Sequence, residues 1–166
     1  MWVTGLPASG KSTIAAALAG QLASRGVDVA VLESDVLRKV FAADQYDASG
    51  RDTFYRQMVF VGRLLVKHGV PVIFDAAANR CAYRDRARRE ISRFLEVYVD
   101  TPLEVCMARD PKGIYHAAKK GQAATVPGLQ EPYEPPQSPN LIVHGENPEG
   151  DARAIVEILV ARRCLG

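Results

Sequence analysis

Residues 5–12 read Gly5-Leu6-Pro7-Ala8-Ser9-Gly10-Lys11-Ser12 and match the pattern GxxxxGK[ST] at every fixed position. The glycines let the backbone curl so that successive N–H groups point at phosphate oxygens, and the helix that follows adds the positive end of its dipole. We expect Lys11 to bridge the β- and γ-phosphates of ATP and the Ser12 hydroxyl to ligate Mg²⁺. This stretch therefore predicts a phosphate-binding loop for ATP and Mg²⁺.

The segments on either side of the loop have the character that such a loop requires. Residues 1–4 are expected to form a strand, and residues 11–25 a helix with Ile14, Leu18 and Leu22 on one face. Phosphate-binding loops of this type join a strand to a helix. The flanking sequence therefore supports the motif.

Short apolar segments and amphipathic segments alternate along the rest of the chain. We expect strands at 27–32, 70–74, 94–99 and 141–143, and helices at 35–42, 53–67, 84–92, 102–108 and 149–162. The helix at 102–108 should begin with Thr101 as its N-cap and Pro102 in its first position. Strands that alternate with helices predict an α/β fold, a mainly parallel sheet covered on both faces, as a single domain over residues 1–166.

Composition narrows the class of protein. Apolar residues make up 48% and charged residues 24% of the 166 residues, and the formal net charge is only +2, so we expect no nucleic-acid partner. No apolar stretch is long enough to span a bilayer, and no signal peptide precedes the loop. Cys81, Cys106 and Cys164 lack the spacing of a zinc site and indicate reduced thiols. We therefore expect a cytoplasmic protein with no membrane partner.

Two carboxylates follow expected strands, at the place where open α/β sheets bind their ligands. Asp75 comes directly after the strand 70–74, and Asp35 comes shortly after the strand 27–32. A phosphoryl acceptor needs a base or an orienting carboxylate, and the metal ion needs its water shell held. We expect Asp35 and Asp75 to act with Lys11 in catalysis and with Ser12 around the metal. Which carboxylate is the base stays open.

Arginine side chains suit anionic substrates because the guanidinium group binds phosphoryl oxygens through paired hydrogen bonds. The candidates are Arg38, one turn beyond Asp35, Arg51 near the start of the long helix, Arg80 after Asp75, and Arg109 on the ATP side. By contrast, we expect Arg84, Arg86, Arg88 and Arg89 to form a solvated helix face.

Residues 110–140 are rich in Pro, Gly, Lys and Gln and too long for an ordinary connection. Lys112, Lys119 and Lys120 would bring positive charge over bound phosphates. We therefore expect a mobile lid, and the alternative is a surface loop without a role in the site.

Together these motifs resemble adenylylsulfate kinase, which phosphorylates the 3′-hydroxyl of adenosine 5′-phosphosulfate (APS). The segment from Gly5 to Thr13 is similar to that family's phosphate loop, and residues 33–38, Glu-Ser-Asp-Val-Leu-Arg, occupy the place of its acidic motif. Residues 109–115, Arg-Asp-Pro-Lys-Gly-Ile-Tyr, match its lid signature, and residues 131–136 resemble its Pro-Tyr-Glu-x-Pro segment. The likeness extends over nearly the whole chain.

The resemblance implies a P-loop NTPase fold with three layers, α/β/α, around five parallel strands. It implies ATP as the phosphoryl donor, Mg²⁺ as the metal, a small nucleotide-like acceptor and, as often in such enzymes, a homodimer. It assigns Arg38 and Arg51 to the substrate anion. It also implies that Lys112 and Tyr115 belong to a lid that closes over the bound nucleotides.

The acceptor half departs from the family's pattern. The phenylalanine that stacks on the substrate adenine falls at Val126, and the serine of the family's Ile-Ser-Pro loop is absent. Residues 75–80, Asp-Ala-Ala-Ala-Asn-Arg, look instead like a loop of other small-molecule kinases, which assigns Asn79 and Arg80 to the substrate. Two alternatives stay open: a kinase for another nucleotide, a sugar or an antibiotic hydroxyl, and a nucleotide-dependent switch that acts through a partner.

Overall fold

The computed structural model describes residues 1–164 and has one parallel five-stranded sheet at its centre. The strands are β1 (Trp2–Gly5), β2 (Ala30–Glu33), β3 (Val72–Asp75), β4 (Glu96–Val99) and β5 (Leu141–Val143). They lie in the order β2-β3-β1-β4-β5, and each neighbouring pair is parallel. The predicted α/β fold with a parallel sheet is confirmed.

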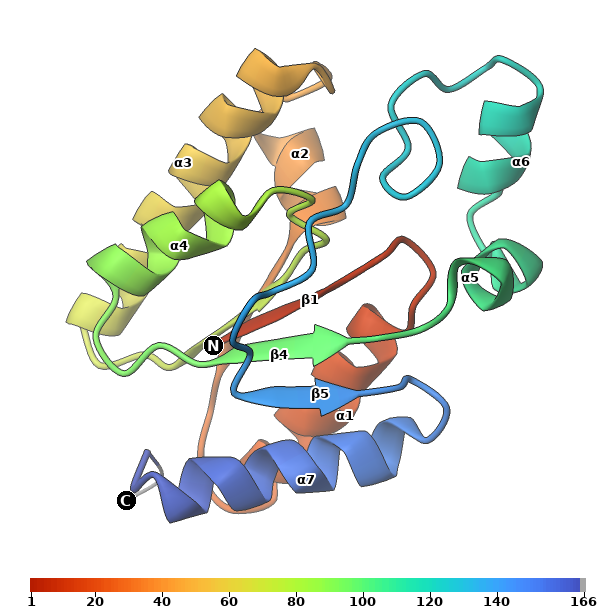
Figure 1. Ribbon diagram of the computed structural model, residues 1–166. Helices are drawn as coiled ribbons and strands as arrows, with labels where there is room; N and C mark the ends of the chain where they lie inside the picture. Colours follow the sequence, from red (N-terminus) through yellow and green to blue (C-terminus); the bar gives the residue numbers. More distant parts are fainter. Residues whose placement is uncertain (165–166) are drawn as a thin grey trace.

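Helices cover both faces of the sheet. They are α1 (Lys11–Ala23), α2 (Ser34–Val40), α3 (Ala48–Lys67), α4 (Cys81–Glu90), α5 (Leu103–Arg109), α6 (Ile114–Lys119) and α7 (Pro148–Ala161). Helices α1 and α7 pack together on one face, while α3 and α4 cover the other, and α5 and α6 lie beyond the carboxyl end of β4 (Figure 1). Within residues 1–164, none of these helices combines the length and the apolar character needed to cross a membrane.

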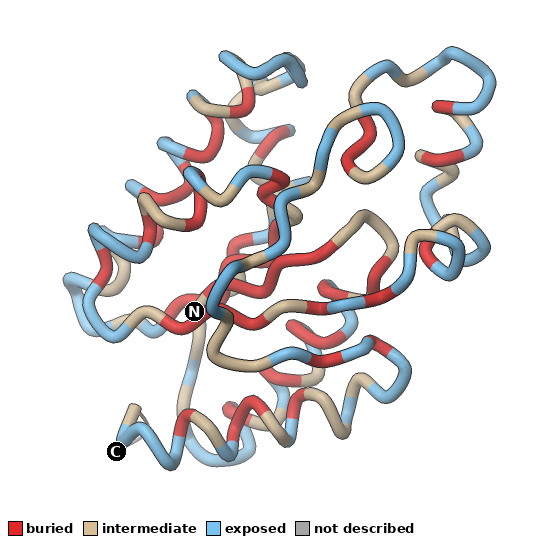
Figure 2. The backbone as a smooth tube through the Cα atoms, viewed as in Figure 1, coloured by how far each residue is buried: buried red, intermediate tan, exposed pale blue. Residues whose placement is uncertain are grey.

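Alternate residues of β1 face the two halves of the core. Val3 packs with Ile14 and Leu18 of α1 on one side of the sheet. Trp2 packs on the other side, where its ring stacks on Phe74 with the ring centroids 4.8 Å apart. Successive strand residues point to opposite faces, and the buried positions accordingly follow the sheet and the inner sides of the helices (Figure 2). The loop after β1 therefore starts from a fixed, fully buried strand.

Two helices begin earlier than the sequence predicted. Helix α3 begins at Ala48, not at 53, because Asp47 caps it and accepts a hydrogen bond from the N–H of Gly50 at 2.7 Å. Helix α4 begins at Cys81, not at 84. Gly50 lies in the first turn of α3, where a glycine costs little once the cap is in place.

The prediction of Thr101 as a helix N-cap is wrong. Helix α5 begins at Leu103 and its N-cap residue is Pro102. The Thr101 hydroxyl lies instead 2.9 Å from the carbonyl oxygen of Ser9 and 2.8 Å from that of His144. The Thr101 hydroxyl therefore bonds to residues distant in the sequence and does not cap the helix.

The long segment 110–140 has two structurally different parts. Residues 110–124, here called the flap, contain α6 and stand away from the sheet (Figure 1). Residues 125–135, here called the strap, cross back toward β4 and accept hydrogen bonds from Arg51, Asn79 and Arg84. Only the flap has the open placement expected of a lid.

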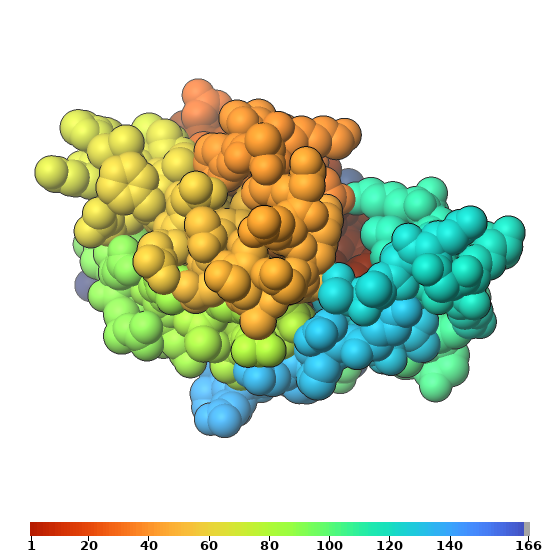
Figure 3. All heavy atoms as spheres, turned by 90° about the horizontal axis from the view of Figure 1, so that it is seen from above, coloured from red at the N-terminus to blue at the C-terminus, as the bar shows by residue number. Residues whose placement is uncertain are grey.

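A hollow separates the flap from the side of the molecule that carries α2. Figure 3 shows this hollow from above, with atoms from the beginning of the chain at its bottom. The carboxyl ends of parallel strands usually form the ligand site of such a sheet. The residues around this hollow are therefore the candidates for a ligand-binding or catalytic site.

Candidate active site

Residues 6–10 connect the end of β1 to the start of α1, as the phosphate-binding motif requires. Gly10 has φ 104°, a left-handed conformation that residues with a side chain rarely adopt. No side chain within residues 1–164 caps the helix that follows, so its first N–H groups have no partner inside the helix or from a cap. Unpaired N–H groups and the positive end of the helix dipole suit a phosphate group.

Lys11 is nearly buried, with 8% of its surface exposed, and its Nζ donates to the carbonyl of Leu6 at 2.7 Å. Burial lowers the pKa of Lys11, and the nearby Asp75 carboxylate offsets part of this effect because it favours the charged form. A buried ammonium group gains most from an additional anionic partner. Lys11 is therefore placed to bind phosphate strongly.

Tyr115 and Arg109 contact the loop from the side of α5 and α6. Tyr115 is 1% exposed, and its hydroxyl donates to the carbonyl of Pro7 at 3.0 Å. Arg109, exposed at the end of α5, donates from Nη1 to the carbonyl of Ser9 at 3.5 Å. Both residues therefore lie at the phosphate-binding loop. Tyr115 points at the loop itself, and only Arg109 is exposed enough to reach a bound nucleotide.

The turn after β5 presses on the same loop. Gly145 in this turn has φ 69°, and a Cβ at this position would lie 2.3 Å from the carbonyl oxygen of Ser9. Real Cβ atoms do not come this close to backbone atoms, so the contact depends on glycine. The loop is thus held between β1, the turn after β5 and the helices that follow β4.

Replacing Gly145 with alanine should displace the loop and weaken ATP binding. We expect a loss of about 1–3 kcal/mol in unfolding free energy from overpacking and a KM for ATP that rises more than the KM for the acceptor. The matched control is Gly26→Ala, because Gly26 has a similar φ of 76° but an added methyl group there would meet nothing within 4 Å. Chemical denaturation and steady-state kinetics measure both effects. Equal KM values for ATP in the two variants would contradict the expected contact.

Asp75 lies at the end of β3 and Asp35 two residues after the end of the neighbouring strand β2, in different environments. Asp75 ends β3, is 5% exposed and favours the charged form of Lys11. Asp35 lies in the first turn of α2, is exposed and forms an ion pair with Lys112 of the flap. Glu33 at the end of β2 pairs in register with Asp75 at the end of β3. Asp35, which follows β2, and Asp75 therefore lie at the same edge of the sheet. Both carboxylates favour the charged form of Lys11 at the phosphate loop, Asp75 more than Asp35, but only Asp35 forms an ion pair with the flap.

Arg51 of α3 and Asn79 of the loop after β3 are in contact with each other. Arg51 is 6% exposed; its Nε donates to the carbonyl of Tyr46 at 2.7 Å and its Nη2 to the carbonyl of Thr125 at 2.5 Å. Its Nη1 reaches Oδ1 of Asn79 at 3.4 Å, and Asn79 in turn donates to the carbonyl of Pro132 at 3.0 Å. These two residues therefore join α3, the loop after β3 and the strap.

Arg38 is packed between aromatic rings. Its guanidinium carbon lies 4.0 Å from the ring centroid of Phe54 and 4.5 Å from that of Tyr46, and Nη1 donates to the carbonyl of Ala43 at 3.0 Å. Cations are attracted to the faces of aromatic rings, so these contacts fix the direction of the guanidinium group. The structure thus places Arg38 beside Arg51, with the Tyr46 ring close to both guanidinium groups.

Arg80 is the predicted substrate residue that the structure leaves apart from this group. It is exposed at the start of α4, where it occupies the N-cap position. Its charge acts on the neighbouring Tyr83, whose pKa is raised by burial and lowered in part by Arg80. Among the predicted substrate residues, Arg80 therefore has the weakest structural support.

Sequence reasoning missed Tyr46 and misplaced Arg84. Tyr46 is 48% exposed although it lies against the two buried arginines, which is the position of a side chain that meets a ligand. Arg84, predicted on a solvated helix face, is 1% exposed and pairs with the buried Glu96. For Tyr46 an aromatic residue between two candidate arginines was the available signal. The available signal for Arg84 was its spacing of three and seven residues from the apolar Ala87 and Ile91, which predicts that the three side chains lie on the buried face of α4.

Comparison with known proteins decides the family. A family model described as adenylylsulphate kinase matches residues 1–144, from the start of the chain through β5. The chain belongs to the adenylylsulphate kinase family. As a member of this family, the protein is a phosphotransferase. The resemblance seen in its motifs is thereby confirmed.

Individual relatives of this adenylylsulphate kinase family member agree over most of its length. The adenylyl-sulfate kinase of Synechococcus sp. (strain JA-3-3Ab) is 38% identical over 143 residues, which are 86% of this chain and 81% of the relative. A probable adenylyl-sulfate kinase of Pseudomonas aeruginosa is 35% identical and covers 100% of this chain and 77% of the relative. The structure of the Mycobacterium tuberculosis APS kinase CysC in complex with AMPPNP and APS has a TM-score of 0.91 at 32% identity, over 96% of this chain and 95% of that one.

Proposed function

We propose that this chain transfers the γ-phosphate of ATP to the 3′-hydroxyl of APS. The observation that carries the proposal is that a buried lysine, Lys11, lies at the phosphate loop, while two buried arginines, Arg38 of α2 and Arg51 of α3, lie together against Tyr46. A buried lysine suits the phosphates of the donor, and paired guanidinium groups suit the phosphosulfate of the acceptor. A relative that is 32% identical binds an ATP analogue and APS together, which supports the same pair of ligands here.

On the donor side, Lys11 and the N–H groups of the loop would stabilise the charge that develops on the γ-phosphoryl group. Tyr115 would act indirectly, because it holds the Pro7 carbonyl and contacts no open surface. Arg109 lies at the rim of the loop, where an exposed guanidinium group can reach the nucleotide.

We assign the role of base or orienting group to Asp35 and the role of holding the metal's water shell to Asp75. Asp35 is exposed at the edge of the hollow and pairs with Lys112, so it is accessible to an acceptor hydroxyl and close to the flap. Asp75 is buried beside Lys11, where it is close to the β- and γ-phosphates of a bound nucleotide. The burial of Asp75 and the exposure of Asp35 support this division of roles.

The oxygen donors at this edge fit Mg²⁺ that arrives with the nucleotide. Mg²⁺ keeps several waters and is usually bound through one or two protein oxygens and the substrate phosphates. The Ser12 hydroxyl is exposed on the first turn of α1, beside Thr13, and Asp75 ends the neighbouring strand β3. Within residues 1–164 no cluster of three or more His, Cys, Asp or Glu side chains could hold a metal by itself. When bound, Mg²⁺ would neutralise phosphate charge, with Ser12 and Asp75 holding it in place.

On the acceptor side, Tyr46 would supply an aromatic surface for the adenine of APS. Val126, at the family's stacking position, is 4% exposed and belongs to a small core cluster with Tyr115, so it offers no platform to a ligand. Tyr46 is about half exposed and adjoins both arginines that we assign to the substrate anion. A ring in this position can stack on a base, while the N–H groups that Arg38 and Arg51 do not use within the protein remain for the phosphosulfate.

Tyr46→Ala should therefore raise the KM for APS by about tenfold, since base stacking on an aromatic side chain is worth about 1–3 kcal/mol. Tyr46→Phe should retain nearly all affinity, because stacking needs the ring and not the hydroxyl. The KM for ATP should stay close to the wild-type value in both variants. Steady-state kinetics with each substrate varied in turn measures this. A Tyr46→Ala enzyme with an unchanged KM for APS would show that the adenine lies elsewhere.

An ATP-consumption assay across a panel of acceptors tests the proposed function. The panel contains APS, other nucleotides, sugars and hydroxyl-bearing antibiotics, each with Mg²⁺ and ATP. We expect turnover with APS to exceed that with every other acceptor. Turnover with a different acceptor and none with APS would favour the alternative kinase. ATP hydrolysis without any acceptor dependence would favour a nucleotide-dependent switch.

A further inference from the structure

Arg84 is the most deeply buried guanidinium group in the described residues, and the donor site does not use it. It lies on α4 with 1% of its surface exposed. Its Nε donates to Oε1 of Glu96 on β4 at 2.7 Å, and Glu96 is itself 4% exposed. The pair thus balances a buried charge across two elements. This leaves the two terminal nitrogens of the guanidinium group for other partners.

Both terminal nitrogens of Arg84 bind backbone carbonyl groups around the acceptor site. Nη1 donates to the carbonyl of Ala78, in the loop after β3, through a short contact. Nη2 donates to the carbonyl of Glu134, in the strap, at 2.7 Å. The loop and the strap are also joined directly, because the N–H of Glu134 donates to the carbonyl of Asn79 at 2.8 Å. One planar side chain therefore fixes two segments that meet at Asn79.

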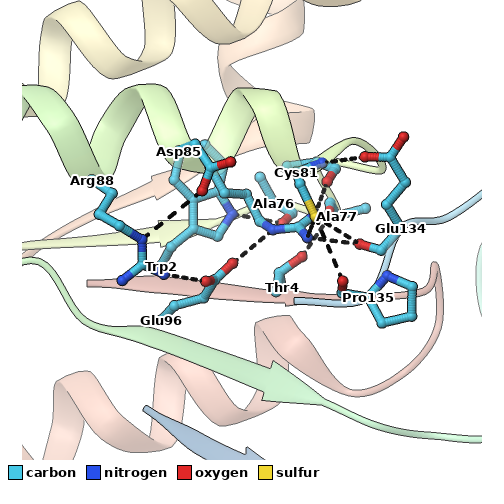
Figure 4. A network of polar contacts seen from close by, with 12 residues as sticks. Trp2, Thr4, Ala76, Ala77, Cys81, Asp85, Arg88, Glu96, Glu134 and Pro135 are labelled. Atoms are coloured by element: carbon cyan, nitrogen blue, oxygen red, sulfur yellow. Dashed lines mark hydrogen bonds and ion pairs between the residues drawn. The ribbon is translucent and has the colours of Figure 1, made fainter. Parts of the chain in front are cut away.

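The network continues to the N-terminus of α4. Figure 4 shows it extending from Arg88 and Glu96 at one end to Cys81 and Glu134 at the other. The N–H of Cys81 donates to Oε2 of Glu134 at 2.7 Å, so the strap is tied to α4 through a side chain as well as through its backbone. Arg88 binds the second carboxylate oxygen of Glu96 but is 39% exposed and contacts neither carbonyl.

We propose that Arg84 is a positioning residue for the acceptor: it holds the loop after β3 and the strap in the arrangement that places Asn79 and Arg51 in the acceptor site. The inference rests on the proposed function, since it concerns the acceptor of that reaction. Asn79 connects to Arg51 through Oδ1 and to the strap through Nδ2, and Arg51 also binds the strap at Thr125. Movement of the strap would therefore displace both substrate-binding side chains.

The strap touches the donor side at β1, where the Tyr133 hydroxyl lies 2.9 Å from Oγ1 of Thr4, but Arg84 itself donates no hydrogen bond to the phosphate-binding loop. The phosphate-binding loop is held by Thr101 after β4, by Arg109 of α5 and by Tyr115 of α6, and none of them accepts a hydrogen bond from Arg84. Loss of the Arg84 contacts should therefore affect the two substrates unequally. A role limited to overall stability would affect them alike.

Arg84→Lys is the variant that separates these outcomes. Lysine keeps a positive charge for Glu96 but has a single ammonium group, which cannot reproduce the planar fork. We expect the KM for APS to rise by about tenfold or more, because hydrogen bonds from a charged donor to buried carbonyl groups are lost, while the KM for ATP changes by less than about threefold. The matched control is Arg88→Lys, which should leave both KM values near wild type. An unchanged KM for APS in Arg84→Lys, or equal changes in both KM values, would overturn the proposal.

Hydrogen exchange without any substrate separates this inference from the proposed function. The amide of Glu134 should exchange faster in Arg84→Lys than in the wild type and in Arg88→Lys, whichever acceptor the enzyme uses. Unchanged exchange at this amide would overturn the proposal even if APS is the substrate. If Arg84→Lys does not fold, Glu134→Ala decides, because it removes only the side-chain bond to Cys81. A raised KM for APS in that variant supports the anchored strap, and an unchanged one contradicts it.

Discussion

Replacing Lys11 with methionine should lower kcat by about 10²–10³-fold, the range found when one group that stabilises transition-state charge is removed. Lys11 is the one buried cation at the phosphate loop among the described residues, and the loop's N–H groups alone cannot replace its charge. The fold should survive, because burial already lowers the pKa of Lys11 and so disfavours the charge that methionine removes. The variant should therefore melt at or above the wild-type temperature.

Single-turnover kinetics and thermal unfolding measure the two sides of this prediction. The matched control is Lys119→Met, because Lys119 is an exposed lysine at the end of α6 in the flap and touches no part of the loop. It should keep kcat within about twofold of wild type, as expected for an exposed residue without a buried partner. A Lys11→Met enzyme that retains wild-type kcat would contradict the assignment of the loop as the donor site.

Asp35→Asn should lower kcat by about 10²–10⁴-fold, the contribution of a positioned general base. Asparagine keeps the size of the side chain and cannot accept the proton of the acceptor hydroxyl. Saturating Mg²⁺ should not restore the rate. Asp75→Asn should behave differently: the Mg²⁺ concentration for half-maximal rate should rise by about 10–100-fold, the usual cost of removing a carboxylate that supports a metal site.

Rate measurements over a Mg²⁺ titration, carried out on both variants, separate the two carboxylates. The assigned roles follow from environment: Asp75 is buried beside Lys11, while Asp35 is exposed and pairs with Lys112. If excess Mg²⁺ rescues Asp35→Asn and fails to rescue Asp75→Asn, the two roles are exchanged. If neither variant loses activity, carboxylates take no part in the reaction.

The parts of the fold that depend on consecutive residues could be predicted from the sequence. All the residues of the phosphate-binding motif are consecutive, at positions 5–12, so the motif can be recognised directly. The strands are short apolar segments, and the helices next to them have clear hydrophobic periodicity. The resemblance implied five parallel strands, but their order was not predicted, since no local pattern states which strand pairs with which. The start of α3 was predicted five residues too late, because Asp47, the residue that caps the helix, was not considered as its N-cap.

The parts that depend on distant contacts could not be predicted in this way. Thr101 stands directly before a proline and has the sequence of a cap, yet its hydroxyl is taken by carbonyl groups from the loop and from the turn after β5. Arg84 lies among other arginines of α4, yet it is the one that is fully buried, because Glu96 on β4 provides a buried partner. Such positions become visible only once β4, α4 and the strap are in place.

Analysis of the product is the most direct test of the claim that the loop delivers a phosphate from ATP to APS. The enzyme is incubated with Mg²⁺, APS and ATP labelled with ¹⁸O in its γ-phosphate, and the product is examined by mass spectrometry and ³¹P NMR. We expect one labelled phosphate on the 3′-oxygen of APS, and none when Lys11→Met replaces the wild type. Labelled inorganic phosphate as the only product, or a label on another oxygen of APS, would contradict the claim.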